Sequence, residues 1–136
     1  VRYYLYCSSI KPILTRCFAP GQMSVSFVKG QGLGNTYIVI NSNELPGKRL
    51  LPAQAAKICD VNWGVGSDGI LLHVQPWDNV SDFGVIIFNP DGSDAQKSGN
   101  GIRIFAKYLY EHGHATQTKF SIITHGTIFN IVLLSG

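Results

Sequence analysis

The stretch NPDGSDAQKSGNGIRIFAKYLYEHG, residues 89–113, passes from turn chemistry to helical periodicity within a few positions. Asn-Pro-Asp-Gly is a reversal signal, because proline presets the second turn position and Asp-Gly follows it. After Gly101 the apolar residues recur at helical spacing, as Ile102, Phe105, Ala106 and Leu109. Gly113 suits the position just beyond a helix end. The stretch therefore predicts a turn followed by a helix over residues 100–112.

The remaining pattern is mostly that of β-strands. Alternating or β-branched runs predict strands at residues 24–30, 36–41, 70–75 and 82–89, and a hairpin over 119–134 that turns near His125 and Gly126. The segment LPAQAAKICD, residues 51–60, predicts a short helix with Pro52 in its first turn. We therefore expect an α+β fold in which mostly antiparallel strands surround one long helix.

Composition limits the classes of function. The chain has 136 residues, enough for one domain with its own core, and 45% of them are hydrophobic against 14% charged, which excludes a disordered chain. The net charge is +3 and the eleven Lys and Arg residues are scattered, so we expect no nucleic-acid partner. The sequence contains no run of eighteen apolar residues, so we expect no membrane span.

The cysteines and the first residues bear on location. Cys7, Cys17 and Cys59 are odd in number and lack C-x-x-C spacing, which argues against a disulfide framework and a structural zinc site and favours the cytoplasm. The regular pattern begins after Met23, the single methionine. We expect a domain over residues 23–136, preceded by an extension over residues 1–22 of unknown role: an upstream segment, a pro-segment or a cloning product.

Two glycine-rich segments resemble phosphate-binding loops. GVGSDG, residues 64–69, fits the spacing G-x-G-x-x-G, but a predicted helix precedes it and a strand follows, the reverse of the dinucleotide-binding order. KGQGLGN, residues 29–35, lacks the Lys-Ser/Thr ending of a P-loop. Its glycines would still let the backbone approach a ligand beside Asn35, although turn chemistry alone explains them equally well.

The start of the long helix is the candidate binding site. The amides of its first turn are expected to be unpaired, at the positive end of the helix dipole, where they favour an anion such as a carboxylate: Gly99, Asn100, Gly101 and Ile102. Ser98 would precede them, and its hydroxyl could instead serve only as the helix cap. Asn89 could likewise serve only its own turn. The four histidines share no spacing with Asp or Cys, so we expect no metal site and no catalytic triad.

Three segments in register resemble the amino-terminal half of the diaminopimelate epimerase family: FVKGQGLGNTYIVI, NWGVGSDGILL and FNPDGSDAQKSGNGIRIFAKYL. The resemblance implies one half of that family's fold, an antiparallel β structure wrapped around a central helix. It also implies a cofactor-independent isomerase related to lysine biosynthesis, which epimerises the α-carbon of diaminopimelate without pyridoxal phosphate. The family uses two cysteines, one from each half, as base and acid on opposite faces of that carbon.

The resemblance assigns roles to five residues. Asn35 and Asn89 match asparagines that contact the substrate, and Gly99 and Asn100 match the Gly-Asn pair that helps to hold it. Ser98 stands at the catalytic position, where the family usually has cysteine. A hydroxyl is a weaker base than a thiol unless another group activates it.

The match to one half leaves two interpretations open. In the first, the chain is a truncated epimerase-like protein that takes an amino acid. In the second, it is a non-catalytic, self-associating half-domain that binds a small carboxylate or amino acid. Both predict that the face toward the cleft is covered, by a second copy in a homodimer or by a partner chain.

Overall fold

The computed structural model describes residues 2–6, 13–19, 23–62, 64–96 and 98–134. They form eight strands, two α-helices and two short 3₁₀ turns. In chain order these are β1 (Arg2–Tyr6), β2 (Ile13–Ala19), β3 (Met23–Gly32), β4 (Asn35–Asn41), η1 (Ser42–Glu44), η2 (Pro46–Lys48), α1 (Pro52–Cys59), β5 (Ile70–Val74), β6 (Phe83–Phe88), α2 (Gly99–Glu111), β7 (Lys119–Thr124) and β8 (Thr127–Leu134).

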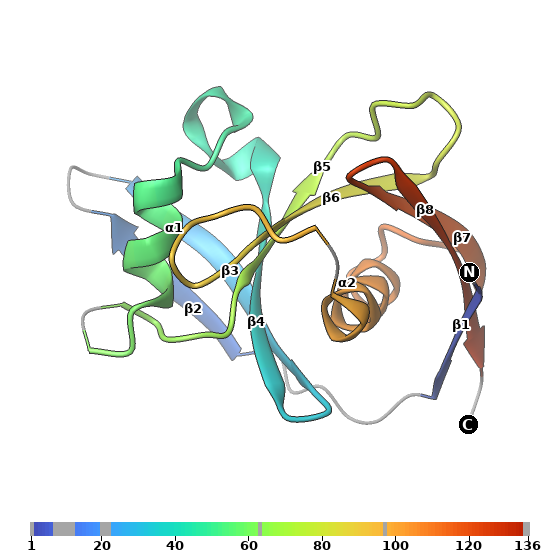
Figure 1. Ribbon diagram of the computed structural model, residues 1–136, viewed down its shortest axis with the longest axis horizontal. Coiled ribbons are helices and arrows are strands. Elements are labelled where there is room, and N and C mark those ends of the chain that lie inside the picture. Colours follow the sequence, from blue (N-terminus) through green and yellow to red (C-terminus); the bar gives the residue numbers. More distant parts are fainter. Residues whose placement is uncertain (1, 7–12, 20–22, 63, 97, 135–136) are drawn as a thin grey trace.

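The eight strands make one curled sheet in the order β1-β8-β7-β6-β5-β4-β3-β2. The sheet wraps around α2, while α1 lies outside the curl (Figure 1). The expectation of a β structure around a central helix is therefore confirmed. The sheet is mixed, however: among the described strands, four pairs are antiparallel and three are parallel, namely β1 with β8, β4 with β5 and β6 with β7.

Two of the parallel pairs follow from the helices. Parallel neighbours need a crossover connection, and α1 joins β4 to β5 as α2 joins β6 to β7. Both crossovers step in the same direction across the sheet, but β6 and β7 run opposite to β4 and β5. Right-handed crossovers then place the two helices on opposite faces.

The two cores agree with this arrangement. Side chains alternate along β4, so that Tyr37 and Val39 join the cluster around α2, whereas Ile38 and Ile40 join the cluster beside α1. The four apolar residues predicted for one face of α2 are fully buried: Ile102, Phe105, Ala106 and Leu109. The sheet around α2 buries Ile104 and Tyr108 as well, so the helix contributes far more than one stripe to the core.

The predicted turns occur where they were expected. The amide of Gly92 donates to the carbonyl oxygen of Asn89 at 2.9 Å, which closes the Asn-Pro-Asp-Gly turn. His125 and Gly126 both have positive φ, 46° and 75°, as a two-residue hairpin turn requires. Gly113 follows α2 with φ of 76°.

The expected extension over residues 1–22 contains the two edge strands. β1 pairs with β8, and β2 pairs with β3, so this segment contributes backbone hydrogen bonds to both ends of the sheet. Residues 7–12 and 20–22 of the segment, with Cys7, lie outside the described residues. Within the described part of the chain, neither helix has the length and apolar character that a membrane crossing requires.

Candidate substrate site at the start of helix α2

Helix α2 begins with a serine cap. Ser98 has extended backbone, with φ of −150°, and its Oγ accepts a hydrogen bond from the amide of Gly101 at 3.0 Å. The amide of Ile102 donates to the carbonyl oxygen of Ser98, also at 3.0 Å. The expectation of four unpaired amides is therefore wrong for Gly101 and Ile102, because the cap residue satisfies both. The two amides before them, of Gly99 and Asn100, have no intrahelical acceptor.

The first turn of α2 packs closely against the sheet. A Cβ atom on Gly101 would lie 3.0 Å from Ser98 Oγ and 3.2 Å from a methyl carbon of Leu71 in β5. Glycine at this position therefore lets the helix start approach the sheet. The first turn carries no acidic side chain, so the partial positive charge of the helix end is not neutralised there.

Asn35 and Asn100 meet at this helix start. Asn100 Nδ2 donates to Asn35 Oδ1 at 2.9 Å, although the two residues are 65 positions apart. Asn35 opens β4 directly after a turn in which Leu33 and Gly34 have positive φ. Two of the residues predicted from sequence are thus brought together, and each amide keeps further donor or acceptor capacity for a ligand.

Tyr37 is a neighbour that sequence reasoning missed. Its hydroxyl lies 2.8 Å from Ser98 Oγ, in a hydrogen bond in which either oxygen can be the donor. Tyr37 stands two residues after Asn35 on β4, so both side chains point to the same face of the sheet. That spacing is the one sequence signal that could have found it.

The GVGSDG loop is tied to the same strand. The amide of Thr36 donates to Asp68 Oδ2 at 2.7 Å, and the amide of Asp68 donates to the carbonyl oxygen of Thr36 at 2.8 Å. Next to it, a Cβ atom on Gly69 would lie 2.5 Å from the carbonyl oxygen of Phe88 and 2.8 Å from the Tyr37 ring. The loop therefore serves close packing beside the helix start.

Asn89 makes local contacts. Its side-chain Nδ2 donates to Ser93 Oγ at 3.0 Å, and its amide donates to the carbonyl oxygen of Ser93 at 2.8 Å. Among the described hydrogen bonds none joins Asn89 to Asn35 or Ser98. The side chain of its neighbour Phe88 belongs to the cluster beside α1, on the other face of the sheet from Tyr37. The contacts of Asn89 are local to the turn but they are not an Asx turn, which Asp91 makes instead by accepting from the amide of Ser93 at 2.8 Å.

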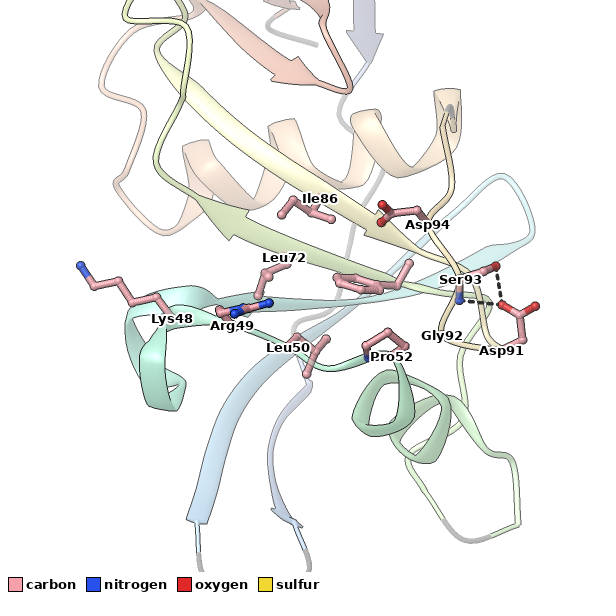
Figure 2. A pocket seen from close by; sticks show the side chains of 11 residues that line it. Lys48, Arg49, Leu50, Pro52, Leu72, Ile86, Asp91, Gly92, Ser93 and Asp94 are labelled. Atoms are coloured by element: carbon pink, nitrogen blue, oxygen red, sulfur yellow. Dashed lines mark hydrogen bonds between the residues drawn. The ribbon is translucent and has the colours of Figure 1, made fainter.

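A larger hollow lies elsewhere. A groove of about 610 Å³ opens between the segment around Leu50 and the strands β5 and β6, on the α1 side of the sheet (Figure 2). Its floor is apolar, while Lys48 and Arg49 line one part and Asp91 and Asp94 another. It includes none of the five predicted site residues. A smaller hollow of about 360 Å³ adjoins Thr36 and Asp68, and Val65, which helps to line it, packs against the cluster beside α1.

No described hydrogen bond joins a histidine or Cys59 to Ser98, Asn35 or Asn100. His73 packs against Tyr108 and His114 near the other end of α2, where burial, with a smaller contribution from His114, lowers the pKa of His73 to about 4. Within the described ranges no three His, Cys, Asp or Glu residues are grouped so as to hold a metal ion. Cys59 is a buried free thiol whose pKa is raised by burial.

The sequence profile described as diaminopimelate epimerase matches residues 27–133 of the chain, which include every site residue described above. The chain belongs to the diaminopimelate epimerase family. It is 43% identical over 102 residues to the diaminopimelate epimerase of Synechococcus elongatus and 47% identical over 104 residues to diaminopimelate epimerase 2 of a Nostoc species. These matches cover 75% and 76% of the chain, but 36% of each relative.

Two further comparisons agree on the family and the fold. The chloroplastic diaminopimelate epimerase of rice is 42% identical over 90 residues, which are 66% of this chain and 25% of that protein. A crystal structure of a phenazine biosynthesis protein of the PhzF family from Bacillus anthracis superposes with a TM-score of 0.58 and 17% identity, over 92% of this chain and 36% of that one. This epimerase-family chain therefore spans about a third of the length of the two cyanobacterial relatives.

Proposed function

We propose that the chain is the amino-terminal half-domain of a diaminopimelate epimerase-like isomerase. Its part would be one wall of a site that holds the carboxylate of an α-amino acid and exchanges the α-proton on one face. The observation that carries the proposal is the meeting of Ser98, Asn35 and Asn100 at the start of α2. Family membership supports diaminopimelate as the substrate and an isomerisation that needs no cofactor.

The proposed binding step uses the helix start. The amides of Gly99 and Asn100 would donate to the carboxylate oxygens, and the positive end of the helix dipole would favour the negative charge. The side chains of Asn35 and Asn100 have hydrogen-bonding capacity left for the amino acid. As the α-proton leaves, negative charge spreads toward the carboxylate, so the same donors would stabilise the carbanion.

The proposed proton-transfer step belongs to Ser98. Ser98 caps the helix whose first two amides are proposed to bind the carboxylate, and it is the predicted catalytic position. One hydroxyl serves one face of the carbon, and complete epimerisation needs a second acid or base on the opposite face. The second wall would come from the rest of a longer chain or from a second copy. Asn89 stays a proposed substrate contact, and its described side-chain hydrogen bond is to Ser93.

The alternative is a non-catalytic half-domain that binds a small carboxylate. The observation in its favour is that Ser98 Oγ already makes two hydrogen bonds inside the protein, as a cap and with Tyr37. Under either proposal the free thiol of Cys59 supports a reducing compartment, for which we propose the cytoplasm.

The two proposals differ in hydrogen exchange. The purified chain would be incubated with diaminopimelate in deuterium oxide, and the α-proton signal followed by NMR. The isomerase proposal expects loss of the α-proton signal faster than in buffer, because exchange on one face needs only one base. Exchange at the buffer rate, in this chain and in a Ser98→Cys variant alike, would favour the binding module.

We also propose that a second copy covers the cleft face. Leu33, at the tip of the β3–β4 turn beside Asn35, is 74% exposed. Large apolar side chains exposed around a site commonly mark an interface.

The dimer has a matched test. Native mass spectrometry and light scattering should detect a homodimer, and Leu33→Asp should shift it to monomer by placing a charge in the contact. Val80→Asp is the control. Val80 is similarly exposed, at 79%, but lies in the loop between β5 and β6, away from the β3–β4 turn. A monomer at every concentration of the unaltered chain would exclude the homodimer.

A further inference from the structure

The hydroxyl of Ser98 makes a second hydrogen bond besides the one that caps the helix. Its Oγ accepts from the amide of Gly101 at 3.0 Å and shares a second hydrogen bond with the Tyr37 hydroxyl at 2.8 Å. A serine hydroxyl has one proton and two acceptor sites. If Tyr37 donates, both acceptor sites of Ser98 are filled and the serine proton is free to point at a ligand.

The Tyr37 ring is held in a fixed position. The residue is 8% exposed and belongs to the core cluster around α2. Its ring lies so close to Gly69 that a Cβ atom there would sit 2.8 Å from Cε1 and 3.2 Å from Cδ1. Because the ring cannot turn away, the phenol oxygen stays within hydrogen-bonding distance of Ser98.

We propose that Tyr37 is a positioning residue that acts through Ser98, donating to Oγ so that the serine hydroxyl can transfer a proton. This inference rests on the proposed function, and it names how a serine can occupy a position where a thiol is expected. Together the phenol and the amide of Gly101 would form a pair of donors around the oxygen that becomes negative.

The proton balance of the step is complete within the pair. When Ser98 donates, its O–H bond breaks, the proton forms a C–H bond with the carbanion, and the electron pair stays on Oγ. The Tyr37 proton then moves to Oγ, and the charge rests on the phenolate oxygen. Abstraction of the α-proton is the same sequence reversed.

The test uses a thiol as a reporter, so that it does not depend on turnover. In a Ser98→Cys chain, the pKa of the introduced thiol is measured from the pH dependence of its alkylation by iodoacetamide. Mass spectrometry of the peptide that contains position 98 separates it from the three native cysteines. A phenol that donates to the thiolate lowers the thiol pKa.

Adding Tyr37→Phe should therefore raise the thiol pKa by about one unit. At a pH below that pKa, the fraction of thiolate should be about tenfold smaller. Tyr110→Phe is the matched control and should leave the thiol pKa unchanged, because Tyr110 is in the last turn of α2 and is 47% exposed. Equal thiol pKa values with and without the Tyr37 hydroxyl would overturn the proposal.

A second measurement covers the case in which Tyr37→Phe does not fold. In the Ser98→Cys chain labelled with ¹³Cζ-tyrosine, the Tyr37 resonance should shift at the pH where the thiol titrates. A resonance that does not follow the thiol would contradict the pairing. Neither measurement needs substrate. Absence of α-proton exchange would count against the proposed function, whereas the thiol pKa alone tests the role of Tyr37.

Discussion

Replacing Ser98 by cysteine is expected to raise the rate of α-proton exchange from diaminopimelate by about a hundredfold, since a well-placed general acid–base group contributes about 10²–10⁴. A thiol ionises near a reference pKa of about 8.5, and the start of a helix lowers that value, whereas a serine hydroxyl depends on its neighbours to exchange a proton. The substitution leaves the proton-exchanging group at the same place in the site and makes it more acidic. The loss of the α-proton NMR signal in deuterium oxide measures the result.

The control for this substitution is Ser98→Ala. It removes the exchanging group and also the cap on the amide of Gly101, so exchange should fall to the buffer rate and the free energy of unfolding should fall by about 1 kcal/mol. If Ser98→Cys exchanges no faster than Ser98→Ala while both are folded, position 98 does not act on the α-proton.

The second large effect concerns Gly92, in the turn that follows β6. Its φ is 87°, and a Cβ atom there would lie 2.1 Å from the carbonyl oxygen of Pro52, at the start of α1. Gly92→Ala must therefore both adopt a left-handed backbone and push two backbone segments apart. We expect a loss of about 2–5 kcal/mol in the free energy of unfolding, measured by urea denaturation.

Gly113→Ala separates the two causes. Gly113 also has positive φ, 76°, but a Cβ atom there would meet no atom within 4 Å. It should lose only the backbone part, about 1–2 kcal/mol. Equal losses for the two variants would show that the contact between the Gly92 turn and α1 does not limit stability.

The sequence patterns correctly predicted helix α2 and the β7–β8 hairpin. Helix α2 follows from its apolar spacing and from Gly113, and the β7–β8 hairpin follows from the His-Gly pair, because each signal lies within a few residues of the structure it determines. The parallel pairs β4 with β5 and β6 with β7 were missed because strand direction depends on which strands the two crossover helices bring together. That information is not contained in any single run of residues.

The candidate site was predicted in part for the same reason. The glycine and asparagine segments identified Asn35 and Asn100, and the fold joins them across 65 positions. The contact of Tyr37 with Ser98 spans 61 positions, and its spacing of two residues from Asn35 on a predicted strand is the one sequence signal that could have pointed to it. The number of free amides was overestimated because one cap residue can satisfy two of them, with its side chain and its carbonyl oxygen.

The most direct test of the carboxylate site is an NMR titration of the ¹⁵N-labelled chain with diaminopimelate. We predict saturable shifts of the Gly99 and Asn100 amides and of the Asn100 side-chain amide, and no such shifts with the dimethyl ester, which lacks both carboxylates. Shifts confined to the groove lined by residues 48–52 and 91–94, or the absence of any shift at Gly99 and Asn100 at saturating ligand, would contradict it.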